Sequence, residues 1–425
     1  MIFLYRLLLN LAIPLGLVSL FFRGFKNPEY WSRWGERFGF TTDEVKNSAP
    51  FDLWIHAVSV GEARAALPLV NLLLEENPNS KILVTTTTPT GSSMVKMLLS
   101  ERVKHCYFPY DLAWAMNRFV SIVSAKTVLI METEVWPNMI AAVKQHDSQL
   151  IYTNVRLSER SYKGYQRFKK FAHDVFSQID YFAVQGQLDK EHLELLNVPS
   201  EKISVTGSIK FDMTIQPSLH ESAQVLRRQL GSDRLIWIAG STRDGEEGRI
   251  LSVYKKLKEK FPSLLLVLVP RHPERFDYVN RKIQRRDLEC VRRTDEVAEL
   301  KSSTDVYLGD TMGELSLMYA CSDVAFVGGS LEPLGGQNIL EPCALGVPVV
   351  FGPHMFNFPD ISRWTLKEGA GLQVRNSEEL EAALEKLLDS PNLRDEMGNR
   401  GLAFIEAHRG ALLKNKQLLQ KYSVV

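Results

Sequence analysis

The chain has 425 residues, of which 45% are hydrophobic and 24% are charged. This composition is ordinary for a globular protein, and the length is ample for two domains. Its formal net charge of +1 provides no overall field that would attract a nucleic acid, so no nucleic-acid partner is expected. The four cysteines are scattered, without the spacing of a zinc site or a disulfide framework, which mildly favours a reducing compartment.

The first segment, residues 1–22, is almost entirely apolar and long enough to enter a bilayer. Four basic residues follow between positions 23 and 37, against the single Arg6 within the segment, and this asymmetry predicts that the rest of the chain is cytoplasmic. Arg6, Asn10 and Pro14 make the segment an imperfect span, and no small-residue cleavage site precedes the charges. We expect a single N-terminal membrane-anchor helix or a deep interfacial helix, with a buried helix and a cleaved signal peptide as alternatives.

After this segment, short β-rich apolar runs alternate with helical patterns, an order that predicts parallel sheets covered by helices on both faces. In the first half the predicted strands are 51–57, 81–87, 126–131, 150–155 and 181–186, and helices begin near Glu62, Gly91, Leu112, Trp136 and Ser158. In the second half the strands are 234–241, 264–270, 305–310, 323–329 and 347–352, and helices begin near Arg243, Glu274, Gly313 and Asn338, with two more at about 377–389 and 392–410.

Helix and strand signals fade over residues 208–222, where glycine, proline and polar residues accumulate. This boundary predicts an anchor over 1–22, one α/β domain over 23–212 and a second over 213–425. Two open parallel sheets that face each other form a cleft, and ligands of such sheets bind outside the carboxyl ends of the strands. The turns after the strands are therefore where functional residues are expected.

The turn "SVGE" follows the first predicted strand and opens a helix. Gly61 permits close backbone approach, and the dipole of the helix is expected to keep Glu62 ionised. Facing the cleft, Glu62 would be a general base for an acceptor hydroxyl. The competing interpretation is structural, because glutamate is favoured in the first turn of any helix.

Further polar residues follow the other strands of this half. "TTTTPTG" offers hydroxyls and Gly91 for contacts to sugar or phosphate, and "METE" places Glu132 and Glu134 where two carboxylates are costly unless hydrogen-bonded or used. Lys210, at the domain boundary, is a candidate to stabilise developing negative charge. The acceptor-side candidates are Ser59, Gly61, Arg64, Thr88, Gly91, Arg156 and Arg160.

Six basic residues lie between Arg156 and Lys170: Arg156, Arg160, Lys163, Arg167, Lys169 and Lys170. These residues are compatible with the solvent-exposed face of a helix. They are equally compatible with binding of an anionic acceptor near a membrane, because basic clusters attract phosphorylated lipid.

The second half has the turns of a nucleotide site. The run "FVGGSLEPLGGQNILEP" feeds a helix predicted from Ile339 to Leu345, with Asn338 as its N-cap and Glu341 placed to accept bonds from ribose hydroxyls. Arg271 follows another strand and suits a phosphate. Further turns of this kind contain Ser241 and Thr242, His272, and Met312, Gly313 and Glu314; each is also compatible with an ordinary capped helix. There is no P-loop, no G-x-G-x-x-G after a strand and no Asp-x-Asp, so a dehydrogenase is not expected and no metal site is predicted.

Together these motifs resemble the 3-deoxy-D-manno-oct-2-ulosonic acid (Kdo) transferase family. "SVGE", "TTTTPTG", "METEVWPN", "NVRLSERS", "GSIKFD", "VPRHPERF" and "GDTMGEL" occur in the family's order over nearly the whole chain. The resemblance implies a GT-B fold with two Rossmann-like domains and a metal-independent, inverting transfer of Kdo from CMP-Kdo to lipid IVA, a step of lipopolysaccharide biosynthesis, at the cytoplasmic face of the inner membrane.

The resemblance also implies roles for single residues. Glu62 matches the family's general base, and Glu132 and Lys210 match its transition-state stabilisers. The positions that match its CMP contacts are Pro270, Arg271, Met312, Gly313, Glu314, Asn338, Ile339, Leu340 and Glu341. Two alternatives stand beside this prediction: a GT-B transferase or epimerase that uses a UDP-sugar, and a membrane-tethered lipid-binding protein without catalysis.

Overall fold

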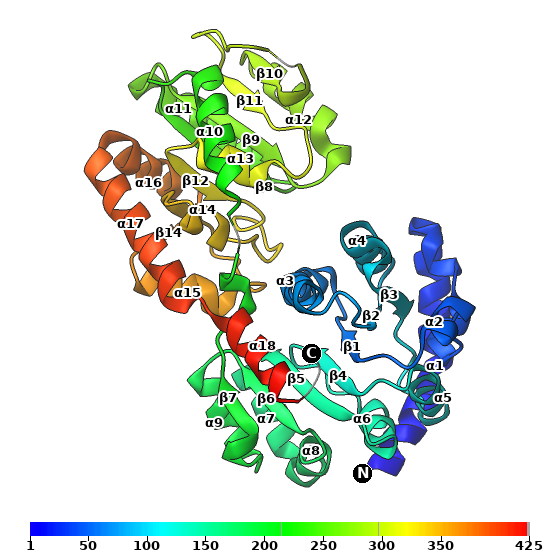
Figure 1. Cartoon of the computed structure of the whole chain (residues 1–425). Coiled ribbons are helices and arrows are strands. Elements are labelled where there is room, and N and C mark those ends of the chain that lie inside the picture. Colours follow the sequence, from blue (N-terminus) through cyan, green and yellow to red (C-terminus); the bar gives the residue numbers. More distant parts are fainter. Residues whose placement is uncertain (214, 296, 423–425) are drawn as a thin grey trace. The chain divides into compact units, whose positions relative to one another are not determined.

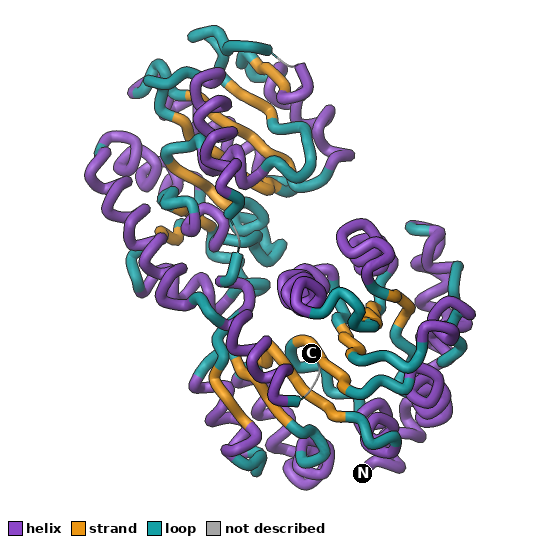
Figure 2. Tube along the Cα trace, in the orientation of Figure 1, coloured by secondary structure: helices purple, strands orange, loops and turns teal. Residues whose placement is uncertain are grey.

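The computed structural model describes residues 1–213, 215–295 and 297–422, whose contacts divide the chain into two compact units. Unit 1 comprises Met1–Asp212 and Arg409–Val425, and unit 2 comprises Met213–His408. The sequence placed residues 409–425 in the second domain, whereas the structure returns this segment to unit 1. Figures 1 and 2 show that each unit has strands enclosed by helices.

The sheet of unit 1 has seven parallel strands in the order β3-β2-β1-β4-β5-β6-β7. The strands are β1 (Leu53–His56), β2 (Ile82–Thr86), β3 (Lys104–Tyr107), β4 (Thr127–Met131), β5 (Gln149–Val155), β6 (Tyr181–Val184) and β7 (Ile203–Val205). All five strands predicted in this half are confirmed. The two that were not predicted, β3 and β7, lie at the two edges of the sheet.

The α-helices of unit 1 are α1 (Ile2–Lys26), α2 (Asp43–Ser48), α3 (Val60–Glu76), α4 (Pro89–Leu99), α5 (Ala113–Val123), α6 (Pro137–Gln145), α7 (Glu159–Arg167), α8 (Lys169–Phe176), α9 (Gln187–Leu195) and α18 (Ala411–Lys421). Unit 1 also contains the short 3₁₀ helices η1 (Pro28–Trp31) and η5 (Ile209–Phe211). The predicted helix starts agree with α3 to α7 within two residues.

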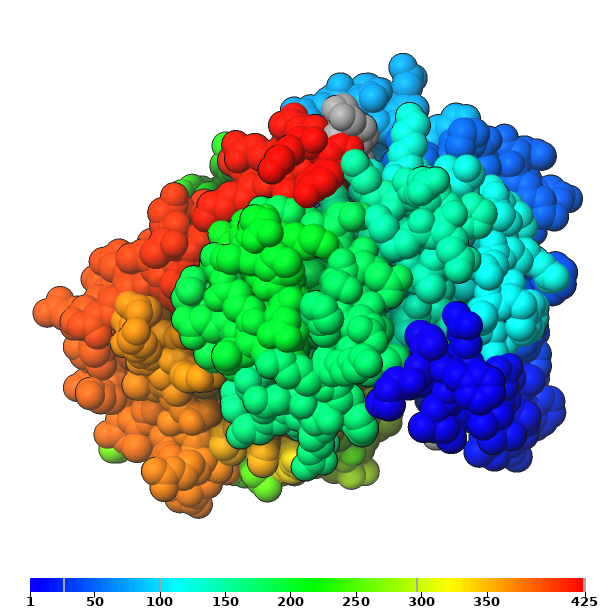
Figure 3. Space-filling model, turned by 90° about the horizontal axis from the view of Figure 1, so that it is seen from below, coloured from blue at the N-terminus to red at the C-terminus, as the bar shows by residue number. Residues whose placement is uncertain are grey.

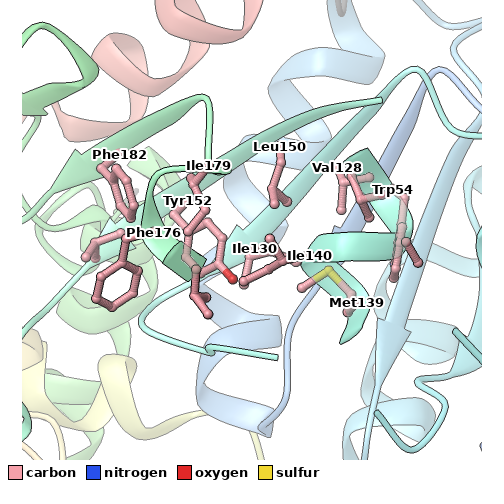
Figure 4. Close-up of a cluster of buried hydrophobic side chains, with 14 of the residues drawn as sticks. Trp54, Val128, Ile130, Met139, Ile140, Leu150, Tyr152, Phe176, Ile179 and Phe182 are labelled. Atoms are coloured by element: carbon pink, nitrogen blue, oxygen red, sulfur yellow. The ribbon is translucent and has the colours of Figure 1, made fainter. Parts of the chain in front are cut away.

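The central strands are apolar because both faces of the sheet are covered. On one face, side chains such as Trp54, Ile130 and Leu150 pack against Met139 and Ile140 of α6, as Figure 4 shows. On the other face, the alternate residues of the same strands pack against α3, α4 and α18. The polar end of Trp54 is satisfied, because its Nε1 donates to Thr85 Oγ1 at 2.8 Å.

The sheet of unit 2 also has seven parallel strands, in the order β10-β11-β9-β8-β12-β13-β14. The strands are β8 (Ile236–Thr242), β9 (Leu265–Pro270), β10 (Cys290–Arg292), β11 (Val306–Leu308), β12 (Val324–Val327), β13 (Val349–Phe351) and β14 (Gly371–Gln373). The five predicted strands are again confirmed, and the unpredicted β10 and β14 are again the edge strands.

The α-helices of unit 2 are α10 (Pro217–Leu230), α11 (Glu246–Lys260), α12 (Phe276–Gln284), α13 (Leu315–Ala320), α14 (Leu340–Ala344), α15 (Pro359–Lys367), α16 (Ser377–Asp389) and α17 (Pro391–His408). Helix α10 lies partly in the stretch where sequence signals fade. It begins at a proline that suits the first helical position, and its buried residues Ala223, Leu226 and Leu230 recur every three or four positions. The predicted helices at the end of the second half correspond to α16 and α17.

Asp212 joins the C-terminal helix to unit 1. Its two carboxylate oxygens accept hydrogen bonds from the backbone N–H groups of Gly410 and Leu412, both at 2.6 Å, at the start of α18. Helix α18 then packs against α3, which follows the first strand of the sheet.

We expect Asp212→Ala to weaken this attachment by about 2 kcal/mol, because two charge-assisted hydrogen bonds at a helix N-terminus are lost. The measurement is limited proteolysis of the C-terminal segment together with thermal unfolding. Asp233→Ala, at an exposed position of unit 2, is the matched control. Equal proteolysis of both variants would show that Asp212 does not hold α18.

Candidate active site

The first candidate site lies at the switch point of the sheet in unit 1. Strand β1 pairs with β2 on one side and with β4 on the other, so the chain leaves the neighbouring ends of β1 and β4 in opposite directions. The turn after β1 contains Glu62, and the turn after β4 contains Glu132 and Glu134. The sheet topology therefore brings three carboxylates to the same edge.

Glu62 is held rigidly at the start of α3. Its Oε2 accepts the N–H of Val58 at 2.7 Å, and its Oε1 accepts the hydroxyl of Ser59 at 2.8 Å. Ser59 Oγ in turn accepts the N–H of Glu62 at 3.2 Å, which completes a reciprocal cap of the helix. Only 7% of Glu62 is exposed.

Burial acts against the helix dipole, which was expected to keep Glu62 ionised. Desolvation raises the pKa of Glu62, and the nearby charge of Glu132 raises it further, against the lowering effect of its hydrogen bonds. A carboxylate with a raised pKa is a stronger base than an ordinary glutamate, so the environment suits proton abstraction from a hydroxyl.

Glu132 has a left-handed backbone, with φ of 60°, a conformation that costs energy for a residue other than glycine. Its N–H donates to Thr153 O at 2.9 Å, and its Oε1 accepts Lys210 Nζ at 3.1 Å. Lys210 is placed by η5, whose Ile209 N–H donates to Asn154 Oδ1 at 3.2 Å. The structure thus brings the predicted pair Glu132 and Lys210 into direct contact.

Glu134 completes the carboxylate cluster, which is defined here as Glu62, Glu132 and Glu134. Burial raises the pKa of Glu134 to about 7, and the charges of Glu62 and Glu132 add to this shift. The charge of Glu132 also raises the pKa of Glu62, so the three carboxylates lie within electrostatic range of one another. Near neutral pH one carboxyl of the cluster therefore retains a proton part of the time.

The other turns of this edge carry most of the acceptor-side candidates. Thr88 Oγ1 accepts the N–H of Gly91 at 3.2 Å, and a Cβ at Gly91 would lie 3.1 Å from that oxygen, so the tight turn favours glycine. The turns of β4 and β5 are joined by Thr133, whose hydroxyl accepts the N–H of Arg156 at 3.2 Å.

The remaining acceptor-side candidates are less constrained. Gly61 is not required by packing, because a Cβ there would meet Ser59 Oγ at an ordinary 3.7 Å. Arg64 and Arg160 have exposed side chains, on α3 and α7 respectively. The structure does not bring Arg160 into the carboxylate cluster.

The second candidate site lies at the equivalent switch point of unit 2, between β8 and β12. Glu246 is fully buried there, and its carboxylate accepts the backbone N–H groups of Arg243 at 2.9 Å, Gly329 at 2.6 Å, Ser330 at 2.9 Å and Leu331 at 3.0 Å. One carboxylate therefore fixes the glycine-rich turn after β12. The sequence analysis missed Glu246, although it stands only four residues after Thr242, in a turn that was singled out.

Close backbone packing supports the same turn. A Cβ on Gly328 would lie 2.6 Å from the Cα of Thr242, so glycine is required where the turns after β8 and β12 meet. Arg271 follows β9, whose last residue is Pro270, and donates its N–H to Thr242 O at 3.0 Å. These contacts bring Pro270 and Arg271 to the edge that carries the glycine-rich turn.

The Met312–Glu314 turn follows β11. Met312 is 58% exposed, and Gly313 has φ of 88° with open space around its missing side chain. The carboxylate of Glu314 is paired with Arg293, at 3.0 and 2.9 Å, and this ion pair lowers its pKa. Arg293 was not predicted, and no motif in the sequence indicated that it fixes Glu314.

The predicted helix after Asn338 is shorter than expected, because α14 begins at Leu340 and ends at Ala344. Asn338 nevertheless accepts the N–H of Leu340 at 3.1 Å, and its Nδ2 donates to Glu341 Oε1 at 3.3 Å. Ile339 and Leu340 are buried, so their side chains serve the core. Burial raises the pKa of Tyr319, and the charge of Glu341 raises it further, which places Glu341 near that phenol.

Within the described ranges no group of three or more His, Cys, Asp or Glu side chains is arranged to hold a metal ion. The four cysteines are free thiols, and burial raises the pKa of each of them.

Comparisons with known proteins agree with this geometry. A family model described as 3-Deoxy-D-manno-octulosonic-acid transferase (kdotransferase) matches residues 32–213, and one described as Glycosyl transferases group 1 matches residues 248–403. A 3-deoxy-D-manno-octulosonic acid transferase of Haemophilus influenzae is 41% identical over 99% of this chain and 98% of that protein. One of Bordetella pertussis is 34% identical over 87% of each chain.

Solved structures with low sequence identity show the fold. UDP-GlcNAc 2-epimerase from Neisseria meningitidis has a TM-score of 0.59 at 15% identity, covering 87% of this chain and 99% of that chain. A glycosyltransferase from Rickettsia africae has a TM-score of 0.56 at 16% identity, covering 88% and 99%. The chain therefore has the α/β architecture of GT-B proteins, and it belongs to the Kdo transferase family.

Proposed function

We propose that this Kdo transferase moves Kdo from CMP-Kdo to lipid IVA by an inverting, metal-independent reaction at the cytoplasmic face of the inner membrane, where its N-terminal helix is the single anchor. The observation that carries the proposal is the rigid, buried Glu62 with its raised pKa, next to the Glu132–Lys210 pair. The membership of the family and the apolar helix α1 support a membrane lipid as acceptor.

In this mechanism Glu62 takes the proton from the acceptor hydroxyl. The hydroxyl oxygen then forms a bond to the anomeric carbon of Kdo, on the side opposite the bond to CMP. The bond between the anomeric carbon and CMP breaks, and its electron pair stays on the phosphate of CMP. A single displacement of this kind inverts the configuration at the anomeric carbon. Lys210 and its partner Glu132 provide fixed charges beside the base, which stabilise the transition state without reorganisation.

On the donor side, the chain offers the turn fixed by Glu246 and the strand end at Arg271. Backbone N–H groups in a glycine-rich turn and a guanidinium are suited to a nucleotide phosphate. The hydroxyls of the ribose are assigned to Glu341. Charge of the leaving CMP is then stabilised by protein groups, and no metal ion is needed.

The test is a detergent assay with freshly generated CMP-Kdo and lipid IVA, with and without EDTA, read by mass spectrometry. A mass gain of one or more Kdo units in both samples is expected. Product with UDP-GlcNAc instead of CMP-Kdo would favour the UDP-sugar alternative. Folded protein that binds CMP but forms no product with either donor would overturn the proposed reaction.

We expect Glu62→Gln to lower the transfer rate by about 10²- to 10⁴-fold, because the amide keeps the shape of the side chain but cannot accept the proton. CMP binding, measured by calorimetry, is expected to be unchanged. Glu75→Gln, at an exposed position of the same helix, is the control and should retain its rate. A Glu62→Gln rate near that of the control would exclude Glu62 as the base.

A second prediction concerns the proton on Glu134. Burial raises its pKa from 4.5 to about 7, so between these pH values the folded state holds a proton that the unfolded state releases. The protonated carboxyl therefore favours the folded state. This contribution to stability is fully present below about pH 4.5 and is lost as the pH rises through 7. Glutamine stays neutral at every pH. The stability of Glu134→Gln relative to the parent should therefore be about 1–2 kcal/mol greater at pH 8 than at pH 5, allowing for partial exposure. Denaturant unfolding of both proteins at the two pH values measures this, and an equal difference at both would contradict it.

A further inference from the structure

Helix α1 has two faces of different character. Along one stripe lie Leu4, Leu8, Leu11, Leu15, Val18, Phe22 and Phe25, called here the outer stripe. These residues recur every three or four positions, are all apolar, and are between 51% (Leu4) and 74% (Leu15) exposed. An apolar stripe of this length on a helix surface marks an interaction site.

The opposite face of α1 is less exposed and is packed most closely near its two ends. Tyr5, Leu9, Ile13, Gly16, Leu20 and Gly24 also recur every three or four positions, and each is half-buried or buried. The helix therefore lies along unit 1 instead of projecting from it. Figure 1 shows α1 running beside α5 and α2, and Figure 3 shows the first residues of the chain, in dark blue, as a lobe on the surface of unit 1.

Polar contacts fix the first turns of the helix. Tyr5 donates its hydroxyl to Asp111 Oδ2 at 2.8 Å, and Arg6 Nε donates to Asn138 Oδ1 at 2.7 Å. Both partners are 2% exposed, and Asp111 also accepts the N–H groups of Asn138 and Met139 at the start of α6. The only charged side chain in the first twenty residues is thus bound to the body of unit 1.

The last turns of the helix are fixed as well. Leu20 is 7% exposed, and Trp31 of η1 donates its Nε1 to the carbonyl of Phe21 at 2.9 Å. The ring of Trp31 lies over Gly24, where a Cβ would be 1.9 Å from Nε1. The hydrogen-bonded positions Tyr5 and Phe21 are sixteen residues apart, or about 24 Å along a helix, whereas a hydrocarbon core is about 30 Å thick. The first turn of α1 is thus bound to the same unit that follows its last turn, which favours a helix lying along that unit.

The surface around α1 suits anionic lipid. The Tyr5 ring lies 6.4 Å from that of Phe171, which places the start of α8 beside the first turns of α1. There Phe168 is 58% exposed, and Lys169 and Lys170 are exposed. At the other end Arg23 is exposed and Trp31 is 43% exposed. Basic and aromatic residues that flank an apolar stripe are typical of binding at the lipid headgroup level.

We propose that α1 lies in the plane of the membrane surface, with the outer stripe among the acyl chains of a single leaflet, and does not span the bilayer. The proposal rests on the membrane association in the proposed function and replaces a spanning anchor by an in-plane one. By length and a mean hydropathy of 1.8, residues Ile2–Phe25 also pass as a spanning helix, so the two arrangements must be separated by experiment.

The first test uses the full-length protein, added to preformed vesicles of phosphatidylethanolamine and phosphatidylglycerol. It carries Ile2→Cys in a background with Cys290→Ser, because Cys290 is the half-buried thiol and the other three are buried. An in-plane helix leaves residue 2 outside, so a membrane-impermeant maleimide should label it without detergent, to the same extent as the exposed control Glu75→Cys. Labelling of Ile2→Cys only after detergent, with the control labelled before, would show a spanning helix and overturn the proposal.

The second test addresses the outer stripe. Leu8→Asp combined with Leu15→Asp should reduce flotation with the vesicles by at least about tenfold, because two carboxylates would enter the acyl region. Asn10→Asp, which adds a charge at an exposed position beside the stripe, is the control and should still float. Flotation of the double variant equal to that of the control would overturn the proposal.

Transfer in detergent is measured on the same proteins. Because the outer stripe is separate from the carboxylate cluster, the double variant should retain its detergent activity. Absence of transfer in the parent protein would count against the proposed function, whereas the labelling and flotation results decide the orientation of α1.

Discussion

Carboxylates that accept backbone N–H groups hold the turns on which this structure depends. A parallel sheet leaves N–H groups without sheet partners where its strands end and where the next helices begin. Glu62 accepts such a group after β1, Glu246 accepts four around the turns after β8 and β12, and Asp111 accepts two at the start of α6. In each case the carboxylate is nearly or fully buried, so removing it would leave donors unsatisfied in a low-dielectric region.

This constraint links stability to chemistry at Glu62. Burial raises the pKa of the carboxylate, and the hydrogen bonds that fix its position lower it, so the two effects oppose each other. Because burial is the larger effect, Glu62 is both well ordered and basic. Glu246 has the same balance of burial and hydrogen bonds, but all of its donors are backbone groups of unit 2, and its role is to shape a turn. The same residue type therefore supports a turn in unit 2 and, in the proposed mechanism, also serves as the base in unit 1.

Much of the fold and of the candidate site could be predicted from the sequence. The central strands are buried on both faces, so their sequences are continuous apolar runs. The turns after these strands contain polar residues, and the topology of the parallel sheet brings these turns to one edge. Glu62, Glu132 and Lys210 were identified in this way, together with the family resemblance, and the structure places Glu132 and Lys210 3.1 Å apart.

What was missed depends on long-range contacts. The four unpredicted strands, β3, β7, β10 and β14, are three or four residues long and lie at sheet edges, where fewer apolar residues are needed. The return of α18 to unit 1 depends on Asp212, which lies nearly two hundred residues earlier in the chain. The partnership of Arg293 with Glu314 and the raised pKa of Glu62 likewise depend on neighbours that no local pattern shows.

The orientation of α1 bears on how a lipid reaches the base. The carboxylate cluster, the candidate acceptor turns and α1 all belong to unit 1. A spanning helix joined to a domain by one end would leave that domain free to tilt on the membrane. An in-plane helix that is attached by Tyr5 and Arg6 at one end and by Trp31 at the other would fix the tilt of unit 1. Under the two proposals, the fold itself would set the height of Glu62 above the lipid headgroups, and the acceptor hydroxyl would meet the base without the lipid leaving its leaflet.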